Sequence, residues 1–550
     1  MHSWMLRARA FFAFISCALF LFPAHAETLV SYEGKVQGDS LMLEVTQAYS
    51  TDDGKEYNYF QLASYVPEGS EVLSVTDSLG PVKDFEFDGR ELNYESNRGP
   101  LRSMERITIN AVAPGVDESL SPLKSFHSFF IAFDDGNPNH VELEFPEEVL
   151  SVLASPGFSF TINGRKVTFE GNGTLEAIVN YSNAGVKHKH FVGIPKGVKD
   201  PEKFQAVLSD ADKLIQLIPR LLGLVPPQTR FPVIALQDED YDRLGRSGIS
   251  GAHYTQGRIV VEESSVYDEN GVVSSEIIPL LVHESLHAFD WQLLQRDSSK
   301  MNWFDEGLAT YIERLAAFAS GERWPGAFAA PVTFLADGSE DYTITLVPKA
   351  TGDALWNYYQ EGDYWVEKWA GEQSLSPERE YFAYALSNLA MQQKIKRDGV
   401  DSFRNAYKSL AAANRPAEGE TLALQLVQAM NLDLKPCKNE SREAFDACIA
   451  ELNAFTPSIP SSAQVTPAAN AKTFQEAFGD DADFDSLIAQ TLARHADAEK
   501  AAVDAVKKEE ELVAFVAAAL LVGGAVVVLL IAYGVRRLLR RKPEMGGKAK

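Results

Sequence analysis

The sequence predicts an α+β protein with an N-terminal β-sandwich-like domain, a mostly helical domain with a small sheet, and a C-terminal transmembrane helix. Three observations support this order. Before residue 190, apolar and polar residues alternate around turn dipeptides, whereas after Phe204 apolar residues recur at helical spacing. From Leu512 to Tyr533 the chain is apolar and uncharged. The 550 residues leave room for two or three domains.

Residues 1–26 have the pattern of a secretory signal peptide. Arg7 and Arg9 form a basic start, and an apolar core follows from Ala10 to Phe22. The ending Ala24-His25-Ala26 is a small-residue cleavage site, which favours removal of the segment over an uncleaved anchor. We therefore expect the chain that follows to lie outside the cytoplasm.

Residues 27–190 are rich in predicted strands. Alternating residues from Phe85 to Tyr94 surround an Asp-Gly turn, and those from Phe158 to Phe169 surround an Asn-Gly turn. Both patterns are typical of β-hairpins. Arg106 to Val112 and Phe126 to Phe133 predict further strands, so we expect a β-sandwich-like domain over 27–190.

Residues 195–455 form a second predicted domain, in which helices dominate. Phe204 to Leu222 has helical apolar spacing, and Tyr381 to Lys394 predicts a later helix. Phe231 to Leu236 and Arg258 to Val261 are short apolar runs that predict buried strands. A small sheet among helices is the expected result.

An H-E-x-x-H motif, His283-Glu284-Ser285-Leu286-His287, lies within an apolar predicted helix. Residues four apart on a helix project from one face, so both imidazoles can bind one Zn²⁺. Burying such polar groups is costly unless a metal or other partners compensate. Glu284 follows the first imidazole and can accept the proton of an activated water.

Glu306 is the candidate third ligand. Eighteen residues separate it from His287, and it lies in a second predicted helix within Trp303-Phe304-Asp305-Glu306-Gly307. Three protein ligands and one open position are what a hydrolytic zinc site requires. Asp305 or Asp290 is a candidate for orienting a ligating imidazole.

The motif, the eighteen-residue spacing and the following W-F-x-E-G-x-A-x-Y pattern resemble the gluzincin metallopeptidases. The resemblance covers about residues 195–430, is tight over 278–315, and is closest to zinc aminopeptidases and related bacterial peptidases. It implies a zincin-type fold, a peptide or protein substrate, and a general base at Glu284. The zinc ligands that it implies are His283, His287 and Glu306.

The resemblance also implies a substrate-lining edge strand over Gly251 to Glu262. Zinc aminopeptidases carry G-x-M-E-N here, and its Glu holds the free amine of the substrate. The matching residues of this chain are Gly251-Ala252-His253-Tyr254-Thr255, without that Glu. We therefore expect an endopeptidase rather than an aminopeptidase.

A tetrahedral intermediate needs a hydrogen-bond donor besides the metal. In the family that this chain resembles, a Tyr or His from a later helix supplies it. Tyr384 is the candidate, with Tyr381 or neither as the alternatives.

Cys437 and Cys448 form an even pair of cysteines, which predicts a disulfide in a chain that lies outside the cytoplasm.

The segments after residue 455 predict a membrane anchor. The Pro/Ser/Ala-rich residues 456–475 predict a linker, and 476–511 a helical stalk. Residues 512–533 are long enough to span a bilayer as a helix, and the basic segment 534–550 predicts a cytoplasmic tail.

The composition excludes one class of partner. With 51 Lys and Arg against 77 Asp and Glu, the chain has a net charge of −26, whereas nucleic-acid binding needs a basic face. The residues do not define an oligomeric state.

Together these patterns predict a membrane-anchored, extracytoplasmic zinc metallopeptidase with a single C-terminal span. One alternative is a catalytically inactive or latent zincin-like ectodomain that binds or senses a ligand. Another is zinc-dependent chemistry on a non-protein bond, such as a cell-wall crosslink.

Overall fold

The structure is a computed structural model, which describes residues 30–241, 252–320 and 377–493 together with Trp356 and Ala532. Gaps within these ranges are 39, 51–58, 64–68, 90, 96–103, 115, 121, 131–138, 156, 268–270, 272, 275–276, 295–301, 414–427, 434–436, 439–440, 454–458, 460, 483 and 492. The chain divides into two compact units, Met1–Asp480 and Asp481–Lys550. The sheets and the helices discussed below all belong to the first unit.

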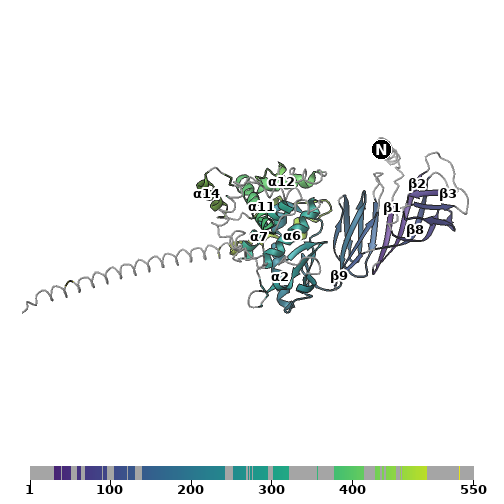
Figure 1. The fold of residues 1–550 in the computed structure, drawn as a ribbon, viewed down its shortest axis with the longest axis horizontal. Coiled ribbons are helices and arrows are strands. Elements are labelled where there is room, and N and C mark those ends of the chain that lie inside the picture. The colour runs from purple at the N-terminus through teal and green to yellow at the C-terminus, as the bar shows by residue number, and fades with distance from the viewer. Residues whose placement is uncertain are drawn as a thin grey trace, which may run out of the picture. The chain divides into compact units, whose positions relative to one another are not determined.

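An eight-stranded sheet begins the described fold, with the strand order β13-β14-β11-β1-β2-β8-β4-β5. Its strands β1, β2 and β8 are labelled in Figure 1. Most neighbours are antiparallel, but β1 and β11 are parallel. Alternate residues of β1 are buried, as expected for a strand with one face on the core. The bounds are β1 (Val30–Gln37), β2 (Ser40–Ser50), β4 (Glu71–Asp77), β5 (Gly80–Pro81), β8 (Met104–Pro114), β11 (Asn139–Glu144), β13 (Phe158–Asn163) and β14 (Lys166–Gly171).

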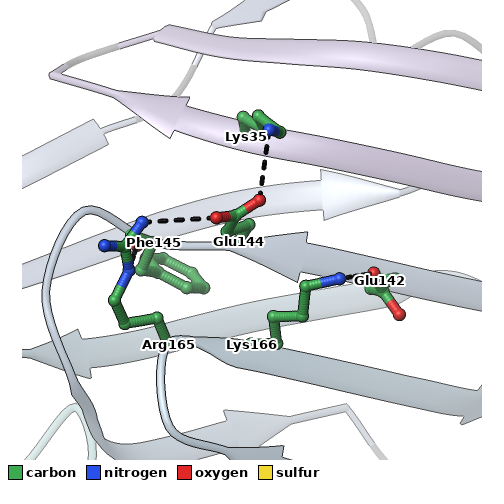
Figure 2. Close-up of polar contacts among 6 residues, drawn as sticks. All are labelled: Lys35, Glu142, Glu144, Phe145, Arg165 and Lys166. Atoms are coloured by element: carbon green, nitrogen blue, oxygen red, sulfur yellow. Dashed lines mark hydrogen bonds and ion pairs between the residues drawn. The ribbon is translucent and has the colours of Figure 1, made fainter.

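The outer face of this sheet carries charge pairs between neighbouring strands. Glu144 lies within 3.3 Å of Lys35 and 3.2 Å of Arg165, and Lys166 lies 2.5 Å from Glu142 (Figure 2). Lys35, by a hydrogen bond and by its charge, lowers the pKa of Glu144. These exposed pairs alternate with core residues along the same strands, which explains the period of two in the sequence.

Two smaller sheets complete the N-terminal region. The four-stranded sheet has the order β12-β15-β10-β9, and the three-stranded sheet has the order β3-β7-β6. Phe126 and Val179 of the four-stranded sheet share one hydrophobic core with Leu41 and Ile109 of the eight-stranded sheet, so these two sheets pack face to face. The bounds are β3 (Tyr59–Ala63), β6 (Phe85–Phe87), β7 (Glu91–Glu95), β9 (Val116–Leu120), β10 (Leu123–Phe130), β12 (Val149–Ala154) and β15 (Leu175–Tyr181).

Both predicted hairpins of this region are confirmed. β6 pairs with β7, and β13 pairs with β14, across turns in which Gly89 and Gly164 have positive φ. The strand predicted from Arg106 is β8. The strand predicted over Phe126 to Phe133 is β10, which begins earlier, while residues 131–133 lie outside the described part of the chain.

A five-stranded sheet belongs to the helical region, with the order β16-β17-β19-β21-β20. The predicted buried strands are confirmed as β19 and β21. The edge strand expected over Gly251 to Glu262 is confirmed only in part, because residues 252–262 form the hairpin β20–β21 and β20 alone lies at the edge of the sheet. Gln256 and Gly257 both have positive φ, which reverses the chain in two residues. The bounds are β16 (Val186–Lys187), β17 (Phe191–Ile194), β19 (Phe231–Leu236), β20 (Ala252–Thr255) and β21 (Arg258–Glu262).

Helices α2 and α6 pack against this sheet, and α7 packs against both α6 and α11 (Figure 1). The predicted helix over Tyr381 to Lys394 lies within α11. The single helix predicted from Phe204 to Leu222 is wrong, because the structure has two helices, α2 and α3. Pro219 has no N–H to donate to Ile215, so it is accommodated in the first turn of a new helix. The bounds are α2 (Pro201–Leu214), α3 (Leu217–Leu222), α4 (Asp238–Tyr241), α5 (Glu263–Val266), α6 (Ile277–Leu294), α7 (Asn302–Ser320), α11 (Pro377–Asp398), α12 (Val400–Ala412) and α14 (Arg442–Asn453).

Gly307 allows α7 and α11 to approach closely. A Cβ atom at this position would lie 2.6 Å from the Cβ of Ser387 and 2.9 Å from its carbonyl oxygen. Only glycine fits this contact without a shift of one helix. Gly307 follows Glu306, so the close approach lies next to a candidate metal ligand.

The chain after α14 returns to the helical region. The predicted disulfide between Cys437 and Cys448 is confirmed. Within the predicted linker, β22 (Thr466–Pro467) pairs with β18 (Leu224–Val225), and Lys408 Nζ donates to the carbonyl of Gln464 at 2.7 Å. The short elements η3 (Ser462–Gln464) and α15 (Phe474–Phe478) flank this pairing.

No helix among the described residues is long and apolar enough to cross a membrane. The predicted span 512–533 lies outside those residues except for Ala532, as do the predicted signal 1–26 and the tail 534–550.

Candidate metal centre

Helices α6 and α7 bring three potential metal ligands together. His283 and His287 lie one turn apart on α6, with ring centroids 5.0 Å apart, and Glu306 lies in the first half of α7. Both helices are almost entirely buried. Phe289 of α6 packs against Phe231 of β19, with ring centroids 5.3 Å apart. The H-E-x-x-H helix is therefore fixed on the small sheet.

Two of the three distances between donor atoms match the spacing of a tetrahedral zinc site. Glu306 Oε2 lies 3.2 Å from His283 Nε2 and 3.4 Å from His287 Nε2. One ligand atom from each residue can be chosen so that all lie within 4.8 Å of one another. Zinc bonds of about 2.0–2.1 Å place tetrahedral ligands about 3.3 Å apart, so these side chains fit the ion.

The charges of the centre are strongly coupled. Burial lowers the pKa of His283, but hydrogen bonds to Glu306 and Glu313 outweigh burial and hold that pKa well above its usual value. Burial likewise opposes the charge of Glu306, yet the two imidazoles hold its pKa well below the ordinary range. A cation bound here replaces the protons that otherwise compensate this carboxylate.

Glu284 lies beside the donors and is held by the edge strand. Its carboxylate is buried, and Oε2 accepts a hydrogen bond of 2.6 Å from the backbone N–H of Tyr254 in β20. Burial raises the pKa of Glu284, and the positive charges of His283 and His287 lower it in part. The bond to Tyr254 leaves Oε1 as the oxygen available for proton transfer.

Glu313 is a functional candidate that the sequence analysis did not identify. Its Oε2 lies 3.0 Å from His283 Nδ1, so the carboxylate accepts from that ring nitrogen and turns Nε2 towards the centre. Glu313 lies seven residues after Glu306 on α7, and this two-turn spacing was the available signal. The hydroxyl of Tyr407 donates to Asp290, one of the two carboxylates considered for this role.

The remaining residues considered from the sequence are two tyrosines of α11 and a histidine of the edge strand. Tyr381 and Tyr384 lie on α11, but their side chains are outside the described part of the structure. His253 on β20 forms a hydrogen bond of 2.9 Å with the Tyr241 hydroxyl through Nδ1. That contact fixes the imidazole against α4.

The fold and this centre define a mixed α/β protein with a buried His-His-Glu site of metal-binding geometry. No protein-family model and no curated protein matches the chain. Among solved structures, an M1 zinc metallopeptidase from Deinococcus radiodurans is similar at 15% identity, over 79% of this chain and 95% of that one, with a TM-score of 0.32. Yeast LTA4 hydrolase in complex with bestatin is similar at 12% identity, over 79% of this chain and 68% of that one, with a TM-score of 0.36. At these values the similarities assign no role to any residue here.

Proposed function

We propose that the chain is a zinc metallopeptidase that hydrolyses peptide bonds. The observation that carries the proposal is the convergence of the His283, His287 and Glu306 donors, all within 4.8 Å of one another, beside the buried carboxylate of Glu284. Three protein ligands leave one position for water or substrate, as in hydrolytic rather than structural zinc sites.

The residues of the chain have distinct tasks in this reaction. When bound, Zn²⁺ supplies a positive charge that lowers the pKa of water towards neutrality and polarises a carbonyl. Glu284 accepts the proton of the attacking water at Oε1, while the Tyr254 N–H holds Oε2. Glu284 then delivers that proton to the leaving nitrogen as the C–N bond breaks. Glu313 fixes the orientation of the His283 ring throughout.

We further propose an endopeptidase, with a Tyr384 hydroxyl assisting at the oxyanion. The edge strand β20 has the sequence Ala252-His253-Tyr254-Thr255, which offers no carboxylate for a free amine. An edge strand binds an extended peptide through backbone hydrogen bonds, which do not require a chain terminus.

Membrane anchoring belongs to the same proposal. The apolar run 512–533 and the basic residues that follow it support a single span with a cytoplasmic tail. The Cys437–Cys448 disulfide supports an oxidising, extracytoplasmic compartment for the folded part. Protease accessibility of the folded part in intact cells tests this topology.

Zinc content and cleavage of a peptide library by the full-length protein test the function. We expect one equivalent of zinc and cleavage of amino-blocked as well as free peptides. Glu284→Gln should retain zinc and lose at least about a hundredfold in kcat, since general-base catalysis contributes 10²–10⁴-fold. The exposed Glu202→Gln serves as the matched control.

Each other outcome has a definite meaning. Full activity in Glu284→Gln would contradict the assignment of the base. Zinc without cleavage in the wild type would favour a latent or ligand-binding ectodomain. Cleavage restricted to free amino termini would contradict the endopeptidase.

A further inference from the structure

We infer that the N-terminal four-stranded sheet is a positioning device for the general base, acting through the hairpin β20–β21. The inference rests on the proposed function and assigns roles to Asn180, Ser151 and Arg258. None of these side chains belongs to the metal centre. Each of them contributes to a hydrogen-bond network between the sheet and the hairpin turn.

The turn of the hairpin is bonded to two strands of the sheet. Asn180 of β15 donates through Nδ2 to the carbonyl of Gln256 at 2.7 Å and to Ser151 Oγ at 2.9 Å. Ser151 of β12 donates in turn to the carbonyl of Gly257 at 2.7 Å. Both turn carbonyls are therefore held by side chains of the sheet.

Arg258 closes the network from the side of the hairpin. Its guanidinium donates to the hydroxyl of Ser125 on β10 and to Gln256 Oε1 at 2.8 Å, and Ser125 donates to Asn180 Oδ1. Asn180 and Arg258 are almost fully buried, at 0% and 1% exposure. A buried polar network fixes geometry closely, because each broken bond leaves an unsatisfied group.

Gly257 allows this contact. A Cβ atom there would lie 2.9 Å from Asn180 Nδ2, and the residue has a φ of +79°. A side chain would strain the turn and displace the amide that holds it. The hairpin is thus joined to the sheet at the position where glycine is required.

The strand β20 of the same hairpin reaches Glu284 close to the turn. Tyr254, two residues before Gln256, donates its backbone N–H to Glu284 Oε2. The sheet also holds the helix that carries Glu284, because Val152 N donates to Gln228 Oε1 at 3.0 Å and Gln228 N donates to Gln292 Oε1 of α6 at 2.8 Å. The sheet is therefore bonded both to the donor strand and to the acceptor helix of this hydrogen bond.

Two variants of the full-length protein test the inference. Asn180→Leu removes both donations at similar volume. The milder Ser151→Ala removes the bond to Gly257 and the bond that Ser151 accepts from Asn180, but leaves the donation from Asn180 to Gln256 in place. We expect kcat to fall about tenfold and about threefold, respectively, with KM and zinc content unchanged. Hydrogen exchange at the Tyr254 amide should accelerate by about the same factors.

The controls make the same two types of substitution, Asn to Leu and Ser to Ala, at positions outside the network. Asn110→Leu removes a bond to Ser74 on the exposed face of the eight-stranded sheet, and Ser159→Ala removes a bond to the carbonyl of Glu170. Both should leave kcat and Tyr254 exchange at wild-type values. A general loss of stability would affect exchange in all sheets, whereas a positioning role affects β20 selectively.

The outcomes separate the two proposals. If kcat and Tyr254 exchange are both unchanged in Ser151→Ala and Asn180→Leu, the inference is overturned. If Asn180→Leu does not fold, the result for Ser151→Ala decides. If the wild type cleaves no peptide, the proposed function fails, while the exchange measurement still decides whether the sheet holds the Tyr254 amide.

Discussion

The two ring nitrogens of His283 have different carboxylate partners, and this asymmetry is the main residue-scale feature of the centre. Nδ1 lies 3.0 Å from Glu313, whereas Nε2 lies 3.2 Å from Glu306. A ring that donates at Nδ1 presents a lone pair at Nε2, which is the state that a metal ligand requires. Glu313 therefore selects the tautomer as well as the orientation.

Glu313→Gln should weaken zinc binding about tenfold to a hundredfold, the usual effect of removing such an outer partner. The amide retains the size of the side chain but not its charge. Titration against a competing chelator measures the affinity, and circular dichroism confirms folding. An affinity equal to that of the wild type would show that Glu313 does not support the ligand, and Glu202→Gln is the control for a lost carboxylate.

At the scale of elements, the centre depends on how closely α7 packs against its neighbours. Glu306 reaches the two histidines because α7 lies along α6, and Gly307 lets α11 approach the other side. The steric fit is tight at Ser387, so α7 has little freedom to move away from α6. In such close packing, a small shift of α11 would displace Gly307 and with it the neighbouring Glu306.

Gly307→Ala should lower the free energy of unfolding by about 1–3 kcal/mol, because overpacking forces the helices apart. Chemical denaturation of the zinc-free protein measures the change, and Ser320→Ala at the end of the same helix should stay within about 0.5 kcal/mol of the wild type. A neutral Gly307→Ala would show that α11 can shift without cost.

At the scale of the whole molecule, the charge coupling in the centre makes stability depend on pH when metal is absent. The pKa values of His283 and His287 are raised in the folded chain, so their contribution is full below the unfolded value of about 6.5 and is lost as pH rises through the raised values. The pKa of Glu306 is lowered, so its contribution is lost only as pH falls below about 4.5. Both contributions are present near pH 6.

With a chelator present, His287→Gln should therefore destabilise the protein more at pH 6 than at pH 9. Thermal unfolding of the wild type and the variant at both pH values measures the difference. An equal loss in melting temperature at the two pH values would contradict the coupling. His127→Gln, at a half-exposed histidine on β10, is the control for loss of an imidazole.

Much of the fold was accessible from local sequence patterns, because period-two and period-3.6 spacing reports which residues face a core. The two hairpins, β19, β21 and α11 follow such patterns. The break between α2 and α3 was missed because apolar spacing continues through it, although Pro219 marks it. The β20–β21 turn was missed because Gln256, without a strong turn preference, has a positive φ.

The same distinction between local patterns and long-range contacts applies to the residues of the site. The spacing of His283 and His287 follows from the helix period, and the structure brings Glu306 to them. The bond from Ser151 to Gly257 joins residues 106 positions apart, so it depends on how two sheets meet rather than on any local pattern. Sequence patterns therefore predict candidate ligands more readily than they predict what positions them.

The pairing of β22 with β18 limits how far a membrane-anchored enzyme could act. Because the folded part extends through α15, the connection to a span that begins at residue 512 consists of residues 479–511, about 33 residues. Even fully extended, such a connection reaches roughly 110 Å. If residues 512–533 are embedded in a bilayer, only substrates within this height above the lipid surface, plus the dimensions of the folded part, can meet the centre, whatever their sequence.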